Sequence, residues 1–130
     1  MSNPILPHKV LLVDDSSPML EALQYLLHDE SDLVVVGVAE SGQGALDLAA
    51  ELTPDVVLLD IRLPDIEGYE VARSLKALPH PPIVILISAN GDPRSRELSV
   101  EAGSDGFIEK GSDWPKIVRQ IRQILAGNPK

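Results

Sequence analysis

Five short runs of apolar residues recur at fairly even spacing along the chain, and most of them are continuous rather than alternating. Continuous runs of this length are typical of strands that are buried on both faces, as in a parallel sheet covered by helices. The runs lie at residues 10–13, 33–39, 56–59, 83–87 and 107–108. The chain is therefore expected to build its core around a buried sheet.

The segments between these runs carry apolar residues at the helical spacing of three or four. The segment around Leu98 and Ala102 has only a narrow apolar stripe, so its helix is expected to be the least firmly anchored. The pattern is clearest in the first and last segments, where the residues on one face are Met19, Leu23 and Leu26, and Ile117, Ile121 and Ile124.

Capping residues mark the starts of three of these helices. Ser17, followed by Pro18, suits an N-cap and a first helical position. Ser41 can cap the second helix, and Asp113 or Ser112 can cap the fifth. Strands that alternate with helices in this way predict an α/β fold of five βα units, with a parallel five-stranded sheet, helices on both faces and right-handed crossovers.

The length of 130 residues suits one domain, expected over residues 1–130 with its core at about 8–126 and a short tail at each end. A formal net charge of −9 without a basic block argues against direct nucleic-acid binding. The absence of cysteine excludes disulfides and thiol chemistry. The apolar runs fall far short of the ~20 residues that span a bilayer, and residues 1–8 lack the features of a signal peptide, so a cytoplasmic protein is expected.

Chemically active side chains follow four of the five runs. Asp14 and Asp15 follow the first run, Asp60 follows the third, Ser88 follows the fourth, and Lys110 lies shortly after the fifth. Ligands in such folds bind outside the carboxyl ends of the strands. These five side chains are therefore expected to converge at one edge of the sheet.

Three carboxylates a few ångströms apart repel one another by several kcal/mol at an effective dielectric of ~20, so a cation is expected among them unless they share a proton. All-oxygen ligands without a thiolate favour Mg²⁺, with Mn²⁺ as an alternative ion. Lys110 supplies a further positive charge that can contact a phosphoryl oxygen. Ser88 adds a neutral hydrogen-bonding group.

These features together resemble the receiver domains of two-component response regulators, and the resemblance extends over essentially the whole chain. Each short motif is weak alone, whereas the complete set, in this order and at strand ends, is highly specific. The matching segments are Asp14 with Asp15, residues 60–68 (DIRLPDIEG), Ser88 with Ala89, and residues 106–110 (GFIEK).

The resemblance implies a flavodoxin-like sheet with strand order 2-1-3-4-5. It implies that Asp60 is the phosphorylation site, whose carboxylate attacks a phosphohistidine on a sensor histidine kinase or a phosphotransfer protein. It also implies that Mg²⁺ is held by Asp15, Asp60 and the backbone carbonyl of Arg62, with Asp14 acting mainly through metal-bound water. Such a domain assists its own phosphorylation and dephosphorylation but is not an enzyme in the usual sense.

The same resemblance implies a conformational switch. Lys110 and Ser88 would bind the phosphoryl oxygens, Ser88 would move toward them and Phe107 would rotate inward. The face of the fourth helix, fifth strand and fifth helix would then change. Arg62 and Asn90 stand two residues beyond Asp60 and Ser88, where the family controls the lifetime of the acyl phosphate. The output domain or downstream partner, and a phosphorylation-dependent homodimer, are left open.

Three residues depart from the common family pattern. Gly111 follows the lysine where proline is usual, so a cis peptide bond is not expected there. Ser88 replaces the commoner threonine, and Leu63 replaces a methionine of similar volume. The departures resemble those of receivers that carry a helix-turn-helix output domain.

The same residues also allow other interpretations, both of single side chains and of the protein class. Asp14 and Asp15 could be helix-capping acids, and Phe107 could be ordinary core. A haloacid-dehalogenase phosphohydrolase needs a second aspartate two residues after the nucleophile, where this chain has Arg62. A flavin carrier would need a phosphate-binding first loop, which the acidic pair would repel. A pseudo-receiver that only binds partners is a further alternative, and the complete residue set argues against it.

Overall fold

The fold was analysed in a computed structural model, which describes residues 7–89, 91, 93–111 and 113–127. Five parallel strands form one sheet in the order β2-β1-β3-β4-β5, so the predicted topology is confirmed. The elements are β1 (His8–Val13), α1 (Ser17–His28), β2 (Leu33–Ala39), α2 (Gly42–Leu52), β3 (Val56–Asp60), α3 (Gly68–Lys76), β4 (Ile83–Ser88), α4 (Pro93–Glu101), β5 (Gly106–Glu109) and α5 (Trp114–Gly127).

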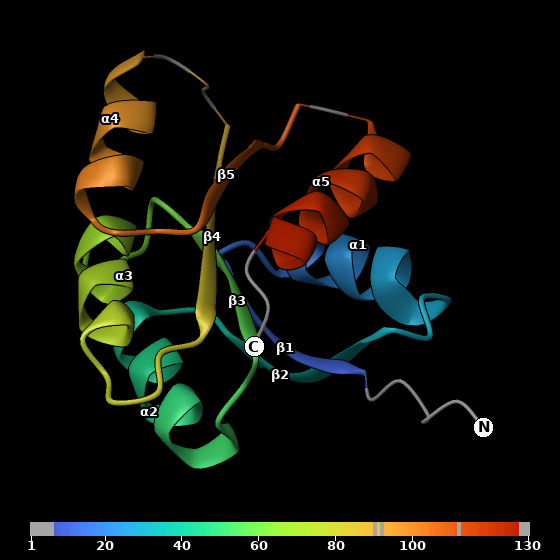
Figure 1. Cartoon of the computed structure of the whole chain (residues 1–130), viewed down its shortest axis with the longest axis horizontal. Coiled ribbons are helices and arrows are strands. Elements are labelled where there is room, and N and C mark those ends of the chain that lie inside the picture. Colours follow the sequence, from blue (N-terminus) through green and yellow to red (C-terminus); the bar gives the residue numbers. More distant parts are fainter. Residues whose placement is uncertain (1–6, 90, 92, 112, 128–130) are drawn as a thin grey trace.

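Two layers of helices cover the sheet. Figure 1 shows α1 and α5 on one face and α2, α3 and α4 on the other. Successive residues of a strand point to opposite faces, so the central strands fill two separate cores. Leu12 of β1 packs in the core beneath α1 and α5, whereas its neighbour Leu11 packs in the core beneath α2 and α3. β1, β3 and β4 have neighbours on both sides, which explains their continuous apolar sequences.

The second strand differs from the prediction that a continuous apolar run is buried on both faces. β2 forms one edge of the sheet, where Val34 is 43% and Val38 39% exposed. These side chains are exposed because β2 has a neighbouring strand on one side only. The order of the strands in space decides this, and the sequence of β2 itself does not show it. β5 at the other edge is also only partly buried.

The helix starts follow the predicted chemistry, with one shift. Ser16, rather than Ser17, is the N-cap of α1, and its hydroxyl accepts a hydrogen bond from the backbone N–H of Met19. Ser41 caps α2 as predicted. At the start of α5 the Asp113 carboxylate accepts a hydrogen bond from the backbone N–H of Lys116, and Ser112, the alternative cap, lies outside the described residues.

α4 is attached to the domain by few buried side chains, as its narrow apolar stripe predicted. Ser99 is the buried residue of α4, and Val100 is 77% exposed.

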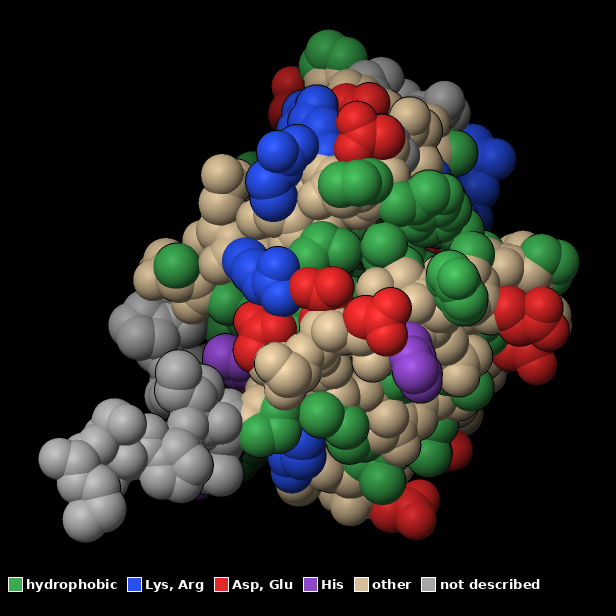
Figure 2. All heavy atoms as spheres, turned by 90° about the vertical axis from the view of Figure 1, so that its right-hand side faces the viewer, with side chains coloured by type: hydrophobic (Ala, Val, Ile, Leu, Met, Phe, Trp, Pro, Cys, Tyr) green, Lys and Arg blue, Asp and Glu red, His purple; other side chains and the backbone are tan. Residues whose placement is uncertain are grey.

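No helix within the described residues has the length and apolar character that a bilayer crossing requires. Figure 2 shows the α1 and α5 side of the molecule, where basic side chains stand beside acidic ones.

α5 is held to the opposite edge of the sheet by an ion-pair network. The guanidinium of Arg122 donates hydrogen bonds to Asp32 at 3.1 and 2.8 Å and also pairs with Glu30. Both acids lie in the connection between α1 and β2. The hydrogen bond from Arg122 lowers the pKa of Asp32 below its usual range.

We expect Arg122→Gln to lower the free energy of unfolding at pH 7 by about 1 kcal/mol or less, the scale of exposed ion pairs. A carboxylate with a depressed folded-state pKa contributes stability above its unfolded-state pKa of ~3.9 and loses it as the pH falls through the folded-state value. The deficit of the variant should therefore shrink when urea unfolding is repeated at a pH below that of Asp32.

Arg119→Gln is the matched control, because it removes the same charge from an exposed position of α5 for which the described residues show no ion pair. Its free energy of unfolding should stay close to that of wild type at both pH values. An Arg122→Gln deficit that is independent of pH, or equal to that of Arg119→Gln, would contradict a role for the network.

Candidate functional site

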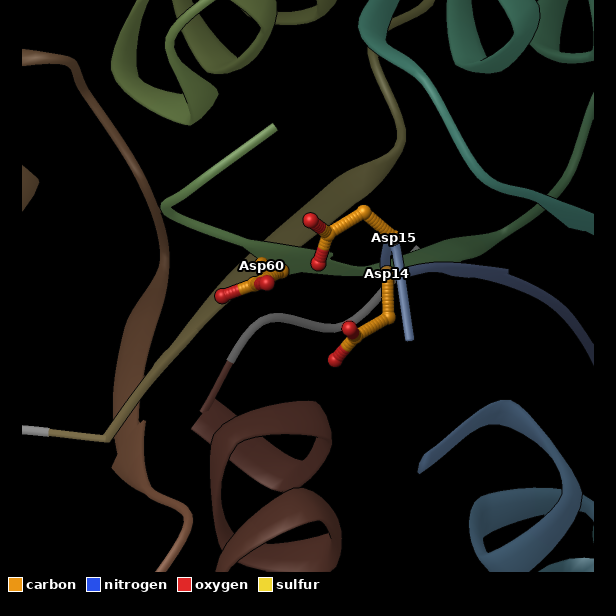
Figure 3. Close-up of side chains that lie close together, drawn as sticks. All are labelled: Asp14, Asp15 and Asp60. Carbon is orange, nitrogen blue, oxygen red and sulfur yellow. The ribbon is translucent and has the colours of Figure 1, made fainter. Parts of the chain in front are cut away.

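Three carboxylates meet at the carboxyl ends of β1 and β3. Asp14 and Asp15 directly follow β1, and Asp60 is the last residue of β3. One oxygen from each lies within 4.8 Å of the others, and Figure 3 shows the three side chains gathered in one space. Asp14 is 2% and Asp60 5% exposed, whereas Asp15 faces solvent.

Lys110 brings a positive charge to the two buried acids. Its Nζ lies 3.0 Å from Asp14 Oδ2 and 3.3 Å from Asp60 Oδ2. The backbone holds it there, because the N–H of Lys110 donates a 2.7 Å hydrogen bond to the carbonyl of Ser88 and so continues the pairing of β4 with β5. Three strands therefore place one ammonium between two carboxylates.

The electrostatics of the cluster follow from burial and mutual charge. Burial, and then the negative charge of Asp14, raise the pKa of Asp60, and the nearby Lys110 only partly offsets this. Burial opposes the charged form of Lys110, yet hydrogen bonds and charges from Asp14 and Asp60 outweigh it and raise the pKa of Lys110. The three residues thus form an acid-rich site with one compensating cation.

Asp14 has both of its oxygens engaged. Oδ1 accepts a 2.9 Å hydrogen bond from the backbone N–H of Ser16, and Oδ2 faces Lys110. The capping alternative is therefore wrong for Asp14, which contacts the N–H of the residue before α1 and, among the described residues, no N–H within the helix. The N-cap itself is Ser16, and Asp14 also belongs to the charged cluster.

The remaining predicted residues lie around this cluster. Ser88 ends β4, is 8% exposed, and stands between the strand of Asp60 and the strand that leads to Lys110. The side chain of Arg62 is exposed, and its backbone N–H makes a long 3.4 Å contact with Asp60 Oδ1. Phe107 is half-buried in β5. Asn90, predicted to modulate phosphate lifetime, lies outside the described residues.

The loop after β3 closes tightly behind Asp60. The N–H of Gly68 donates a 2.8 Å hydrogen bond to the carbonyl of Ile61. A Cβ at Gly68 would overlap the backbone carbonyl of Asp60 and the Cα of Ile61, so glycine is required by close backbone approach. The described part of the chain contains no cis peptide bond. The bond between Lys110 and Gly111 is therefore trans.

Two further contacts near the site were not foreseen. Asp65, in the loop after β3, accepts hydrogen bonds from the first backbone N–H groups of α2. Arg96 of α4 lies over the ring of Phe107, with its Cζ 4.8 Å from the ring centroid, and donates a 2.7 Å hydrogen bond to Glu109 of β5. Asp65 belongs to the motif at residues 60–68, but the motif does not show which groups its side chain contacts, and the partners of both Asp65 and Arg96 are distant in the chain.

The three carboxylates suit a divalent cation. Among the described residues they are the acids that lie close enough to share one ion. All the candidate ligands are oxygen atoms, as hard cations such as Mg²⁺ and Mn²⁺ require. The fit rests on this donor set and on the excess of negative charge that Lys110 alone leaves in the site.

Comparison with known proteins agrees with the geometry. The chain is 39% identical over 120 residues to the response regulator GacA of Pseudomonas aeruginosa. The aligned region covers 92% of this chain and 56% of GacA. The signal receiver domain of the response regulator NarL from Mycobacterium tuberculosis superposes with a TM-score of 0.88 at 32% identity, over 95% of this chain and 99% of the receiver.

The crystal structure of a CheX-CheY-BeF3-Mg²⁺ complex from Borrelia burgdorferi is also similar, with a TM-score of 0.84 at 25% identity, over 96% of this chain and 92% of that one. The chain spans about half the length of the curated relatives it matches. The model of the response regulator receiver domain matches residues 10–122. The chain therefore belongs to the response regulator receiver domains, the flavodoxin-like signalling domains of two-component systems.

Proposed function

We propose that this domain accepts a phosphoryl group on Asp60 from the phosphohistidine of a sensor histidine kinase or phosphotransfer protein. The observation that carries the proposal is the Asp60 carboxylate, which ends a buried strand 3.3 Å from the ammonium of Lys110 and within an acidic cluster. A carboxylate oxygen of Asp60 forms a bond to phosphorus while the phosphorus–nitrogen bond of the donor breaks. The imidazole leaves with the electron pair of that bond.

Mg²⁺ is the cation proposed for this site, with Mn²⁺ as an alternative. When bound, it neutralises negative charge on the carboxylates and on the incoming phosphoryl oxygens. Asp15 and Asp60, with the backbone carbonyl of Arg62, would be direct ligands. Asp14 suits the indirect role through water, because its oxygens are already engaged at 2.9 and 3.0 Å, whereas the contacts of Asp60 are longer, at 3.4 and 3.3 Å. The related complex that contains BeF3 and Mg²⁺ supports Mg²⁺ as the cation.

The chain contributes mainly position and charge to the transfer. Lys110 would contact one phosphoryl oxygen as a point charge, and the hydroxyl of Ser88 would contact another. Ser88 ends β4 and Lys110 directly follows β5, so the paired strands hold the backbone of both residues and their side chains need to move only locally when the phosphoryl group arrives. A dehalogenase-type hydrolase remains unsupported, because Arg62 cannot serve as the second acid. A pseudo-receiver would not need Asp14, Asp60 and Lys110 held in contact.

Phosphorylation is proposed to act on the face of α4, β5 and α5. Ser88 would move toward the phosphoryl group and Phe107 would rotate inward. Arg96 covers the exposed side of Phe107 and pairs with Glu109, so the same contacts hold α4 against β5. α4 has few buried side chains, as expected of an element that switches.

The whole signalling pathway extends beyond this chain. The chain covers 56% of the length of GacA, and the output domain or downstream protein that responds to phosphorylation is left open. A phosphorylation-dependent homodimer is compatible with the exposed Val100 on α4. Arg62 and Asn90 are proposed to set the lifetime of the acyl phosphate through water access.

The central prediction concerns covalent modification. Incubation with Mg²⁺ and acetyl phosphate should add one phosphoryl group to the wild-type protein, observed by intact mass, and none to Asp60→Asn. Asp47→Asn is the control, because Asp47 is an exposed acid of α2 that accepts a hydrogen bond from Gln43 of the same helix and lies outside the carboxylate cluster. Modification of Asp60→Asn to the same extent as wild type would refute the assignment.

A second prediction concerns the contact between α4 and β5. Arg96→Ala should raise amide hydrogen exchange across α4 in the unphosphorylated protein, because it removes the hydrogen bond to Glu109 and uncovers Phe107. Arg94→Ala is the control, since Arg94 pairs at 3.6 Å with Glu97 of its own helix.

Phosphorylation of the wild type should raise exchange in the same α4 peptides. Equal exchange in the Arg94 and Arg96 variants, or identical protection of α4 before and after phosphorylation, would argue against the proposed switch.

A further inference from the structure

The carboxylate of Asp65 binds the start of a helix that lies 22 residues or more earlier in the chain. Oδ1 accepts a 2.7 Å hydrogen bond from the backbone N–H of Gly42, and Oδ2 accepts a 2.9 Å bond from that of Gln43. Both donors belong to the first turn of α2, where backbone N–H groups lack partners within the helix. One side chain thus joins the loop after β3 to α2.

The loop and the helix also approach each other closely at this point. A Cβ at Gly42 would lie 2.9 Å from Val71 Cγ2 and 3.0 Å from Ile66 Cβ, so the absence of a side chain lets the loop lie against the helix. Hydrogen bonds from Gln43 and then Gly42 lower the pKa of Asp65 below its usual range. The carboxylate is therefore engaged in its ionised form.

Asp65 lies at the middle of a loop whose two ends are already fixed. The N–H of Ile61 donates a 3.2 Å hydrogen bond to Ile87 of β4, and the N–H of Gly68 donates one to the carbonyl of Ile61. Within the part of the chain that the structure describes, the hydrogen bond found for the backbone of Arg62, between these ends, is the long 3.4 Å contact of its N–H with Asp60 Oδ1. The backbone at Arg62 therefore needs a further constraint, and Asp65 supplies one three residues later.

We propose that Asp65 is a positioning residue for divalent-cation binding: its clamp on α2 fixes the loop backbone at Arg62 relative to the carboxylates of Asp15 and Asp60. The inference rests on the function proposed above. Mg²⁺ demands nearly ideal octahedral geometry, so a backbone ligand on a loose loop binds it poorly. Residues that orient ligands, without touching the metal, commonly alter metal affinity by large factors.

The clamp also explains why an acid so near Asp60 is absent from the carboxylate cluster. Asp65 is five residues beyond Asp60 and carries the same side chain, yet both of its oxygens are directed to α2. The cluster of described acids comprises Asp14, Asp15 and Asp60. The N-terminal dipole of α2 favours the negative charge of Asp65 where it is.

The test is calorimetric titration of the whole chain with MgCl₂ at neutral pH, without any phosphodonor. Asp65→Ala should bind Mg²⁺ roughly tenfold more weakly than wild type, the lower end of the effects known for residues that orient metal ligands. Asp65→Asn keeps one oxygen that can accept one of the two N–H groups, so its affinity should fall between those of Asp65→Ala and wild type.

Two controls separate positioning from simpler effects. Ser41→Ala removes the other cap of α2, the 3.0 Å hydrogen bond from the Gly44 N–H, and leaves the loop after β3 unaltered. Glu67→Gln removes one negative charge from that loop at an exposed side chain with no capping hydrogen bond. Both variants should bind Mg²⁺ within about twofold of wild type, although Ser41→Ala should lower the melting temperature as Asp65→Ala does.

The outcomes are distinguishable. An unchanged affinity in folded Asp65→Ala, or an equal loss in Ser41→Ala or Glu67→Gln, would overturn the positioning role and leave the proposed phosphoacceptor function standing. If Asp65→Ala fails to fold, Asp65→Asn decides by the same comparison. A wild-type protein that binds no Mg²⁺ would overturn both this inference and the metal site on which it rests.

Discussion

The site depends on the balance of charge between two buried carboxylates and one ammonium. Asp14 and Asp60 are almost fully buried, and burying an unpaired charge costs several kcal/mol. Lys110 contacts both, but one positive charge cannot neutralise two acids and the adjacent Asp15. The remaining negative charge makes the site suited to a divalent cation. The parallel sheet brings these residues together, because the carboxyl ends of β1, β3 and β5 lie at the same edge and the charged residues lie at or just after those ends.

Close backbone approach is the second requirement of the site. Gly68 lets the loop after β3 return to Ile61, and Gly42 lets the same loop lie against α2. That contact brings the polar start of a helix against the loop, where Asp65 is the residue of the loop that accepts hydrogen bonds from the first N–H groups of α2 among the described residues. Its carboxylate satisfies two of them and fastens the loop at the same time. If the proposed role of Asp65 holds, the same two hydrogen bonds cap the helix and set the geometry of the site.

Much of the fold and the central cluster was predictable because it follows from local patterns. Apolar runs gave the strands, and strand ends gave Asp14, Asp15, Asp60 and Lys110. What the sequence could not provide was information on distant neighbours. The exposure of β2 depends on its place at the sheet edge, and the N-cap shift to Ser16 is a matter of one residue, within the usual uncertainty of helix boundaries.

The structure around the cluster is anchored unequally, and this inequality gives the proposed switch a direction. On one side, Asp65 and tight glycine contacts join the loop after β3 to α2. On the other, α4 is held by Arg96 through contacts with Phe107 and Glu109 that remain largely exposed. A ligand shifts an equilibrium only by its differential interaction with the two states. The first side resists displacement. Phosphoryl binding would therefore displace α4, because the fewest buried contacts have to be broken there.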